Sequence, residues 1–203
     1  SIAAANVWVL GFRPEEQIER VLGYAAGQGL TRFGALAPDD AYGRRSLAAW
    51  REALARLPGT DAALARTYPA DTDSPTDAVR EVAAVGRPDG LPEEEALGDG
   101  SVGASATLPP PGLDAVLVAD GGFRVAAIAA GLVRYEVSPP ATRLLGTMRW
   151  QDDPELMAEP LLRGAWLATW PPDAVGAFAR RFEAAYGRSP APLAVLAYDA
   201  TAL

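Results

Sequence analysis

The 203-residue chain contains no cysteine and no histidine, and because lysine is absent too, all 18 of its basic side chains are arginines. Without cysteine the chain can form no disulfide and offers no thiolate to a substrate or to zinc. Without histidine it lacks the usual general base near neutral pH and the Ser-His-Asp relay. Without lysine it has no Schiff-base residue and no Walker-type phosphate lysine. These absences leave mainly carboxylate, Ser/Thr/Tyr or Arg chemistry, and we expect no catalytic residue, no metal site and no cofactor.

The chain is acidic, with a net charge of −8 and a pI of about 4.6. A surface that binds nucleic acid needs a basic patch to neutralise phosphates. The adjacent basic pairs here are Arg44–Arg45 and Arg180–Arg181, and each falls on an expected helix, where a solvated face explains it. Nucleic acid is therefore not an expected partner. No apolar run approaches the length of a membrane span, so we also expect no transmembrane segment.

Short apolar runs alternate with amphipathic stretches along the whole chain. Strands are expected at 7–10, 33–37, 64–68, 115–119, 144–148 and 165–169. The intervening stretches repeat apolar residues at helical spacing, as Ile18, Val21, Leu22 and Ala25 do. Strands that are apolar throughout are buried on both faces, so they need helices on both faces. The pattern predicts an α/β fold with a doubly wound, mostly parallel sheet.

Two segments depart from this rhythm within what we expect to be a single α/β lobe over residues 1–203. Residues 87–112 contain five Gly, five Pro and five acids against one Arg, which predicts an exposed surface insertion that could be removed. Residues 193–203 carry an apolar stripe at helical spacing. We expect this C-terminal segment to dock on its own sheet or on a second copy, making a homodimer.

In open α/β sheets, ligands bind beyond the carboxyl ends of the strands. Three loops are expected at that edge, namely 38–43, 120–123 and 148–151. Together they offer carboxylates, glycine backbone, an arginine and aromatic rings, which suits a small polar ligand held by hydrogen bonds and ring faces.

Simpler roles compete with ligand binding at each of these loops. Asp39 or Asp40 suits the N-cap of the next helix, and so does Asp120. Gly121-Gly122 suits a tight turn, and Trp150 suits core packing. A metal-binding acidic pair, as in phospho-receiver domains, is not expected at Asp39-Asp40 because the lysine of that site is missing.

Several segments together resemble type 1 periplasmic binding proteins, the Leu/Ile/Val-receptor class. They are "VWVLGFRPEEQIERV" near the start, "RFGALAPDDAYGRR" from Arg32, "LDAVLVADGGF" from Leu113 and "GAWLATWPPDAVGAFARRFEAAYGRSP" from Gly164. The similarity is greatest to the penicillin-binding protein activators of the bacterial envelope. It implies a two-lobed clamshell, of which this chain supplies mainly the second lobe.

The resemblance also implies which residues face the cleft. These are Tyr42, Asp120, Gly121, Gly122, Phe123, Met148, Arg149 and Trp150. Transport receptors of this class usually place an acid after the fifth strand to meet an amino-acid ammonium. This sequence has Met148-Arg149-Trp150 there instead, and an arginine suits a carboxylate.

The function implied first is that of a non-enzymatic, periplasmic envelope regulator that acts through a protein partner, such as a peptidoglycan synthase, or through a small ligand. The alternative is a solute-binding receptor for amino acids or similar small polar ligands, working with the permease of an ABC importer. A stand-alone enzyme is the third hypothesis.

Overall fold

The computed structural model describes residues 13–91, 108–151, 153–169 and 172–191, together with residues 194, 197 and 198. These residues fall into two compact units, one within 14–168 and the other including residues from 169 onward. The strand expected at 7–10 and most of the 193–203 segment lie outside the described residues. The docking and dimerisation expected of that segment therefore stay predictions.

Five parallel strands form the sheet of the 14–168 unit, in the order β2-β1-β3-β4-β5. The strands are β1 (Arg32–Pro38), β2 (Asp61–Tyr68), β3 (Ala115–Val118), β4 (Arg143–Gly146) and β5 (Trp166–Leu167). In β1, Leu36 lies between Arg66 of β2 and Val118 of β3. The chain thus leaves β1 toward one side and returns to its other side, which makes the β1/β3 gap the switch point of the sheet.

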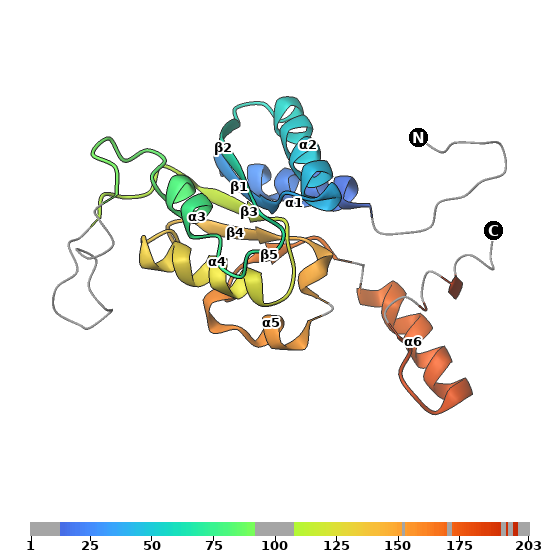
Figure 1. Ribbon diagram of the computed structural model, residues 1–203. Coiled ribbons are helices and arrows are strands. Elements are labelled where there is room, and N and C mark those ends of the chain that lie inside the picture. The colour runs from blue at the N-terminus through green and yellow to red at the C-terminus, as the bar shows by residue number, and fades with distance from the viewer. Residues whose placement is uncertain are drawn as a thin grey trace. The chain divides into compact units, whose positions relative to one another are not determined.

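Helices cover both faces of this sheet (Figure 1). Helices α1 (Pro14–Gly27) and α2 (Ala41–Arg56) pack on one face, while α3 (Thr76–Ala83), α4 (Phe123–Arg134) and α5 (Pro154–Ala158) pack on the other. Successive β1 residues serve the two cores in turn: Ala35 and Ala37 face α1 and α2, and Leu36 faces the opposite layer. The predicted doubly wound α/β fold is confirmed.

Full coverage explains why the sequence of the central strands is apolar at every position. Six of the seven β1 residues are buried. The edge strand β2 is partly exposed, and it begins at Asp61 rather than at the expected residue 64. The sequence pattern missed its first residues because they are exposed or only partly buried. β4 ends at Gly146, two residues early, since a 3-10 turn (Met148–Trp150) follows it.

Two residues at the described ends of the 87–112 segment are buried, contrary to the expected exposure, whereas 88–90, 109 and 110 are exposed as expected. Arg87 is only 5% exposed and Leu108 only 8%. The Arg87 guanidinium donates hydrogen bonds to the carbonyl oxygens of Ala83, Tyr135 and Pro109, at 2.8, 2.8 and 2.9 Å. A buried arginine whose donors are satisfied by carbonyls holds the two ends in place. Residues 92–107 lie outside the described part of the chain.

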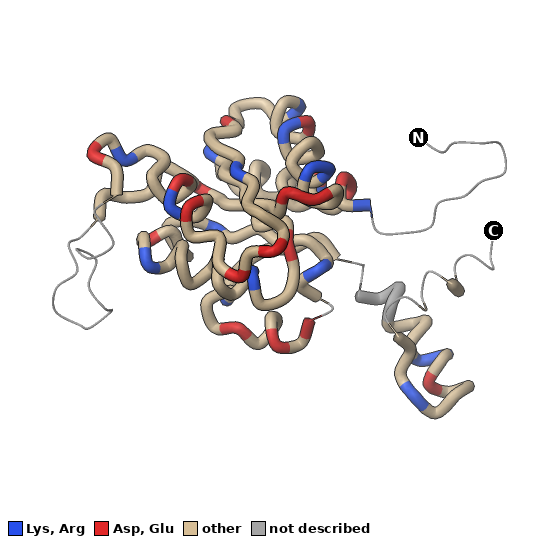
Figure 2. The backbone as a smooth tube through the Cα atoms, in the orientation of Figure 1, with Lys and Arg blue, Asp and Glu red and all other residues tan. Residues whose placement is uncertain are grey.

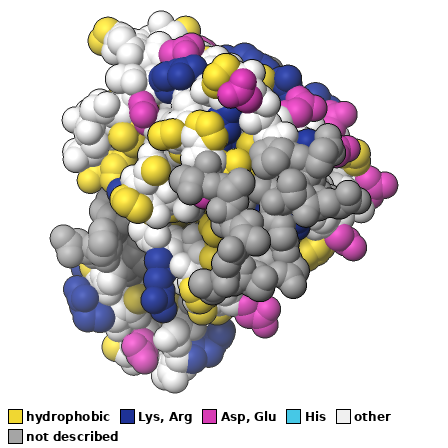
Figure 3. All heavy atoms as spheres, turned by 90° about the vertical axis from the view of Figure 1, so that its left-hand side faces the viewer, with side chains coloured by type: hydrophobic (Ala, Val, Ile, Leu, Met, Phe, Trp, Pro, Cys, Tyr) yellow, Lys and Arg dark blue, Asp and Glu magenta, His cyan; other side chains and the backbone are white. Residues whose placement is uncertain are grey.

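Charged residues of both signs are distributed over the elements of the 14–168 unit (Figure 2). Two ion pairs join α1 to α2, Arg45–Glu15 at 2.7 Å and Arg56–Glu19 at 3.6 Å. Exposed pairs of this kind contribute at most about 1 kcal/mol each. On the face shown in Figure 3, the described arginine, acidic and hydrophobic side chains are likewise interspersed.

The second unit contains α6 (Pro172–Tyr186). The Phe178 ring lies 5.7 Å from that of Phe182 and 5.0 Å from that of Tyr198, measured between centroids. Arg181 Nη1 donates to the Tyr198 hydroxyl at 3.1 Å. None of the helices described in either unit has the length and apolar character needed to cross a membrane.

Candidate functional site

The carboxyl ends of the strands bring polar side chains to one edge of the sheet. Tyr68 ends β2, Asp120 follows β3 and Thr147 follows β4. Across this edge the Asp39 N–H donates to the Tyr68 carbonyl at 2.7 Å, and the Tyr42 hydroxyl donates to Thr147 Oγ1 at 2.9 Å. The expectation that the three candidate loops share one edge is confirmed, and it follows from the parallel topology.

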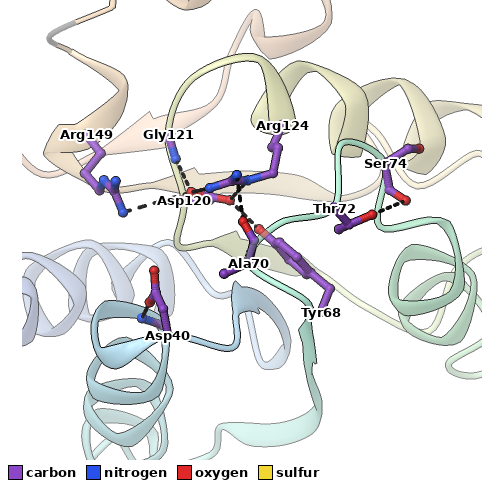
Figure 4. Close-up of polar contacts among 10 residues, drawn as sticks. Asp40, Tyr68, Ala70, Thr72, Ser74, Asp120, Gly121, Arg124 and Arg149 are labelled. Carbon is purple, nitrogen blue, oxygen red and sulfur yellow. Dashed lines mark hydrogen bonds and ion pairs between the residues drawn. The ribbon is translucent and has the colours of Figure 1, made fainter.

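Asp120 is the centre of this edge (Figure 4). Its side chain is 0% exposed. Oδ2 accepts hydrogen bonds from the Tyr68 hydroxyl at 2.8 Å and from Arg124 Nε at 2.7 Å. Oδ1 accepts from the Gly121 N–H at 2.8 Å and from Arg124 Nη2 at 3.1 Å. Since a carboxylate has about four acceptor positions, these four donors fill it.

The environment fixes the protonation state of each member of this network. Burial by itself raises the pKa of Asp120, but the hydrogen bonds from Arg124, Tyr68 and Gly121 outweigh it and hold that pKa below its ordinary value. The hydrogen bond to Asp120 raises the pKa of Arg124. Burial and then the charge of Asp120 raise the pKa of the Tyr68 phenol. At neutral pH the network is therefore a carboxylate, a guanidinium and a neutral phenol that donates.

Asp120 is not the N-cap of α4, so that expectation is wrong. The N-cap is Gly122, whose φ of 68° lies in the left-handed region that favours glycine. A Cβ on Gly121 would lie 3.3 Å from Arg149 Cβ. The two glycines thus provide the turn and a close approach of the loop to Arg149, while the Asp120 side chain stays free of capping and binds Arg124.

Arg149 lies beside this network and is 45% exposed at its side chain. Its guanidinium carbon lies 4.6 Å from the centroid of the Tyr42 ring, within range of a cation–π interaction. Its Nη1 is 4.0 Å from Asp120 Oδ1, and no hydrogen bond joins Arg149 to any other residue that the structure describes. Burial raises the pKa of the Tyr42 phenol, which keeps its proton for the Thr147 hydrogen bond. Arg149 is thus a guanidinium held in place by an aromatic ring.

The acidic turn after β1 starts a helix, as the N-cap hypothesis for Asp39 or Asp40 predicted. Asp40 is the N-cap of α2, and its Oδ1 accepts from the Gly43 N–H at 2.7 Å. Asp39 instead pairs with Arg44 at 2.9 Å, and both of these side chains are exposed. A Cβ on Gly43 would lie 1.8 Å from the Pro38 carbonyl oxygen, so only glycine lets α2 start against the strand.

Two other residues that were expected to face the cleft, Met148 and Trp150, are half-buried and buried. Met148 is half-buried, and its N–H donates to Gln17 Oε1 of α1 at 2.9 Å. Trp150 is 1% exposed, and its ring packs against Gly146 so closely that a Cβ on that glycine would lie 2.5 Å from the ring. Its expected contact with a ligand stays a prediction, and the burial of its ring argues against it.

Phe123 and Gly122 line a separate hollow of about 180 Å³ between α4 and α5. The Phe123 side chain is exposed, and the hollow's other lining residues include Asp153, Glu155 and Glu159. Asp153 and Glu159 accept hydrogen bonds from the backbone N–H groups of the turns that they cap. The hollow is therefore acidic, unlike the side of the loop on which Arg149 lies.

Sequence reasoning missed four residues of the edge. Arg124 had a readable signal, because it stands four residues after Asp120 and that spacing suits an ion pair. Tyr68 ends an expected strand and Thr147 lies within another, but nothing in the sequence pairs them with Asp120 or Tyr42. Gln17 contacts Met148 across 131 residues of sequence, and no local pattern could reveal it.

A groove of about 340 Å³ lies away from this edge, between α3 and α4. Its lining is mainly small and apolar, with Arg134 as the one charged residue among the described lining. No three described carboxylates lie close enough together to hold a metal ion. The converging charged and polar groups at the carboxyl edge make that edge the candidate site.

The whole chain agrees with one protein family. The model of the family described as periplasmic binding protein matches residues 2–203. The chain belongs to the periplasmic binding protein family. No curated protein matches it. The family expected from the sequence resemblance is confirmed, whereas no comparison bears on the penicillin-binding protein activator branch.

Solved structures show the same type 1 fold. A branched-chain amino acid ABC transporter periplasmic ligand-binding protein from Burkholderia xenovorans is 16% identical with a TM-score of 0.65, covering 95% of this chain and 45% of that one. A leucine binding protein from Thermotoga maritima is 14% identical with a TM-score of 0.64, covering 95% of this chain and 49% of that one. An ABC transporter solute binding protein from R. palustris, solved with benzoate, is 17% identical with a TM-score of 0.62, covering 96% of this chain and 47% of that one. The chain thus spans less than half the length of these proteins, and identities this low show the fold alone.

Proposed function

We propose that this chain is a ligand-binding lobe of a solute-binding receptor that serves an ABC importer outside the cytoplasm and catalyses no reaction. The observation that carries the proposal is the fixed network around Asp120 at the β1/β3 switch point, beside a half-exposed Arg149. Two of the solved structures named above are ABC transporter components that bind ligands, which supports this function over the others.

The network suits a binding surface because it removes freedom from the loop that would meet the ligand. Asp120 ties the Gly121-Gly122 turn to β2 through Tyr68 and to α4 through Arg124. Arg124 Nη1 also donates to the Ala70 carbonyl at 3.1 Å, which holds the segment after β2. A surface that is ordered before binding loses less entropy when the ligand arrives. The opposite wall of the cleft, in this proposal, comes from the half of a receptor that this chain does not span.

The receptor function is preferred over the envelope regulator that the sequence resemblance implied first. A regulator would need a protein-binding face, and the described residues offer no observation that specifies one. The receptor function needs polar side chains beyond the carboxyl ends of a doubly wound sheet, and Arg149 and Tyr42 lie there. An ABC permease is the corresponding partner, and the periplasm is the corresponding location.

Amide chemical-shift mapping tests this proposal. The ¹⁵N-labelled chain is titrated with benzoate and, separately, with leucine, and a single lobe is expected to bind with a Kd of about 1 mM, or about −4 kcal/mol. The largest shifts should fall on Gly121, Gly122 and Arg149, with Gly59 at the opposite edge of the sheet as the internal control. Shifts confined to the α3–α4 groove, or no shift with either compound, would overturn the proposal.

A further inference from the structure

We propose that the ligand taken at this edge is an organic carboxylate, held by the Arg149 guanidinium, and that it is not a ligand recognised through an ammonium group. This inference rests on the proposed function, since it names the ligand class of the same site. It follows from the distribution of charge among the side chains in Figure 4.

Asp120 cannot serve as the acceptor for a ligand ammonium. Within the described part of the chain it is the one fully buried acid, and its carboxylate already receives four hydrogen bonds. An ammonium group would have to displace Arg124 or Tyr68 from a buried carboxylate, and leaving such donors unpaired is costly. Asp120 therefore holds the protein together and offers no free acceptor to the ligand.

Counting the charges leaves one arginine without a carboxylate of its own. Asp120 is bound by both Nε and Nη2 of Arg124, while Arg149 reaches the same carboxylate only at 4.0 Å. The nearby Asp39 is paired with Arg44, and Asp40 caps α2. Two guanidinium groups thus share the buried carboxylate of Asp120, and Arg149 is the one of the two that makes no hydrogen bond to it.

The position of Arg149 suits a planar anion. Its guanidinium lies over the Tyr42 ring, which is itself fixed by the hydrogen bond to Thr147. Stacking engages the face of the guanidinium and leaves the N–H groups at its rim available, and these match the two oxygens of a carboxylate.

The acidic hollow on the other side of the loop is a competing place for a ligand of the opposite charge. It is lined by Phe123 together with Asp153, Glu155 and Glu159, so it would favour an ammonium group and repel a carboxylate. The two hypotheses therefore predict opposite charge preferences and shifts at different amides. Phe123 and Ala126 report on the hollow, while Arg149 and Gly121 report on the arginine side.

Matched probes separate these possibilities. The ¹⁵N-labelled chain and its Arg149→Gln, Arg149→Lys and Arg44→Gln variants are each titrated with benzoate and isovalerate, and with the cations benzylamine and isoamylamine. We expect both carboxylates to bind and both amines not to bind. Arg149→Gln should weaken carboxylate binding about tenfold or more, because charge-assisted hydrogen bonds are lost. Arg149→Lys should retain part of the affinity, and Arg44→Gln should change nothing, since Arg44 is paired with Asp39.

Each remaining result overturns the inference in a recognisable way. If the amines bind and shift Phe123 and Ala126, or if Arg149→Gln leaves carboxylate binding unchanged, the ligand class is wrong while the proposed function stands. If none of the four probes shifts any amide at the edge, and leucine does not either, both fail together. Because the Arg149 side chain is 45% exposed, its variants should keep the parent amide spectrum away from the edge, which shows that they are folded.

Discussion

Arg124 meets Asp120 through two parallel hydrogen bonds, from Nε to Oδ2 at 2.7 Å and from Nη2 to Oδ1 at 3.1 Å. The Asp120 side chain is fully buried, while the Arg124 side chain is 21% exposed. Such a pair does not need to be a net source of stability, but either partner alone is strongly unfavourable in this position. The pair therefore determines whether the Gly121-Gly122 loop stays in place.

Replacing Arg124 with Gln should lower the free energy of unfolding by about 3–5 kcal/mol, because a buried carboxylate loses its counterion. Urea denaturation followed by circular dichroism measures the change. The matched control is Arg44→Gln, which removes an exposed ion pair and should cost about 1 kcal/mol or less. Adding Asp120→Asn to the Arg124 variant should restore part of the loss. Equal losses for the two arginine variants would contradict this account.

Tyr68→Phe removes one donor from Asp120 and leaves the ring. The hydroxyl donates to a charged acceptor, so the unfolding free energy should fall by about 1.5–3 kcal/mol. Tyr24→Phe is the control, because Tyr24 is 55% exposed and its hydroxyl donates to no residue that the structure describes. Chemical denaturation of both variants checks the prediction, which fails if Tyr68→Phe is as stable as Tyr24→Phe.

The protein should lose stability in acid, in part through Asp120. Its folded pKa lies below the ordinary value of 3.8, so its contribution is fully present above that value and is lost as the pH falls through the lower folded pKa. The difference in unfolding free energy between the parent and Asp120→Asn should be constant above about pH 5 and should shrink below about pH 4.

The comparison uses this difference because Asp114 titrates in the same range. Burial raises the pKa of Asp114, but hydrogen bonds from Thr31 and Arg32 lower it further than burial raises it. Asp114 is unchanged in the Asp120→Asn variant, so its effect cancels. A difference that stays flat down to about pH 2 would show that Asp120 has an ordinary pKa in the folded protein.

Gly43→Ala should be strongly destabilising, because the added Cβ would lie 1.8 Å from the Pro38 carbonyl oxygen and the start of α2 would have to move. Overpacking of this kind costs about 1–3 kcal/mol or more. Gly23→Ala is the matched control, since it lies within α1 with nothing within 4 Å of the added Cβ. That change should stabilise the protein by up to about 1 kcal/mol. Thermal melts that move in the same direction for both variants would contradict the prediction.

Much of the fold could be predicted from the sequence because the central strands are buried on both faces. A strand such as β1, with six of its seven residues buried, has to be apolar throughout, and this pattern is visible without a structure. The edge strand β2 was harder to place, because its exposed positions carry no apolar signal. The burial of Arg87 was missed for a related reason. The Gly-, Pro- and acid-rich sequence after it does not indicate that three carbonyl oxygens accept hydrogen bonds from its guanidinium.

The sequence predicts where the candidate site lies in the fold, but it does not predict which of its side chains are already hydrogen-bonded within the protein. Parallel topology alone brings the loops around Tyr42, Asp120 and Arg149 to one edge. Which of these side chains is satisfied depends on long-range contacts, such as the one that Tyr68 makes with Asp120 across 52 residues. Those contacts turn Asp120 from a candidate ligand-binding residue into a support, and they leave Arg149 as the residue that faces the proposed ligand.

A crystal of the chain soaked with para-bromobenzoate gives the most direct test, since the anomalous signal of bromine locates the ligand without reference to any assumed site. We predict that the carboxylate lies within hydrogen-bonding distance of the Arg149 guanidinium, next to the Tyr42 ring, with Arg124 still bound to Asp120. A bromine peak in the α3–α4 groove or in the acidic hollow beside Phe123, with Arg149 not in contact, would contradict the account.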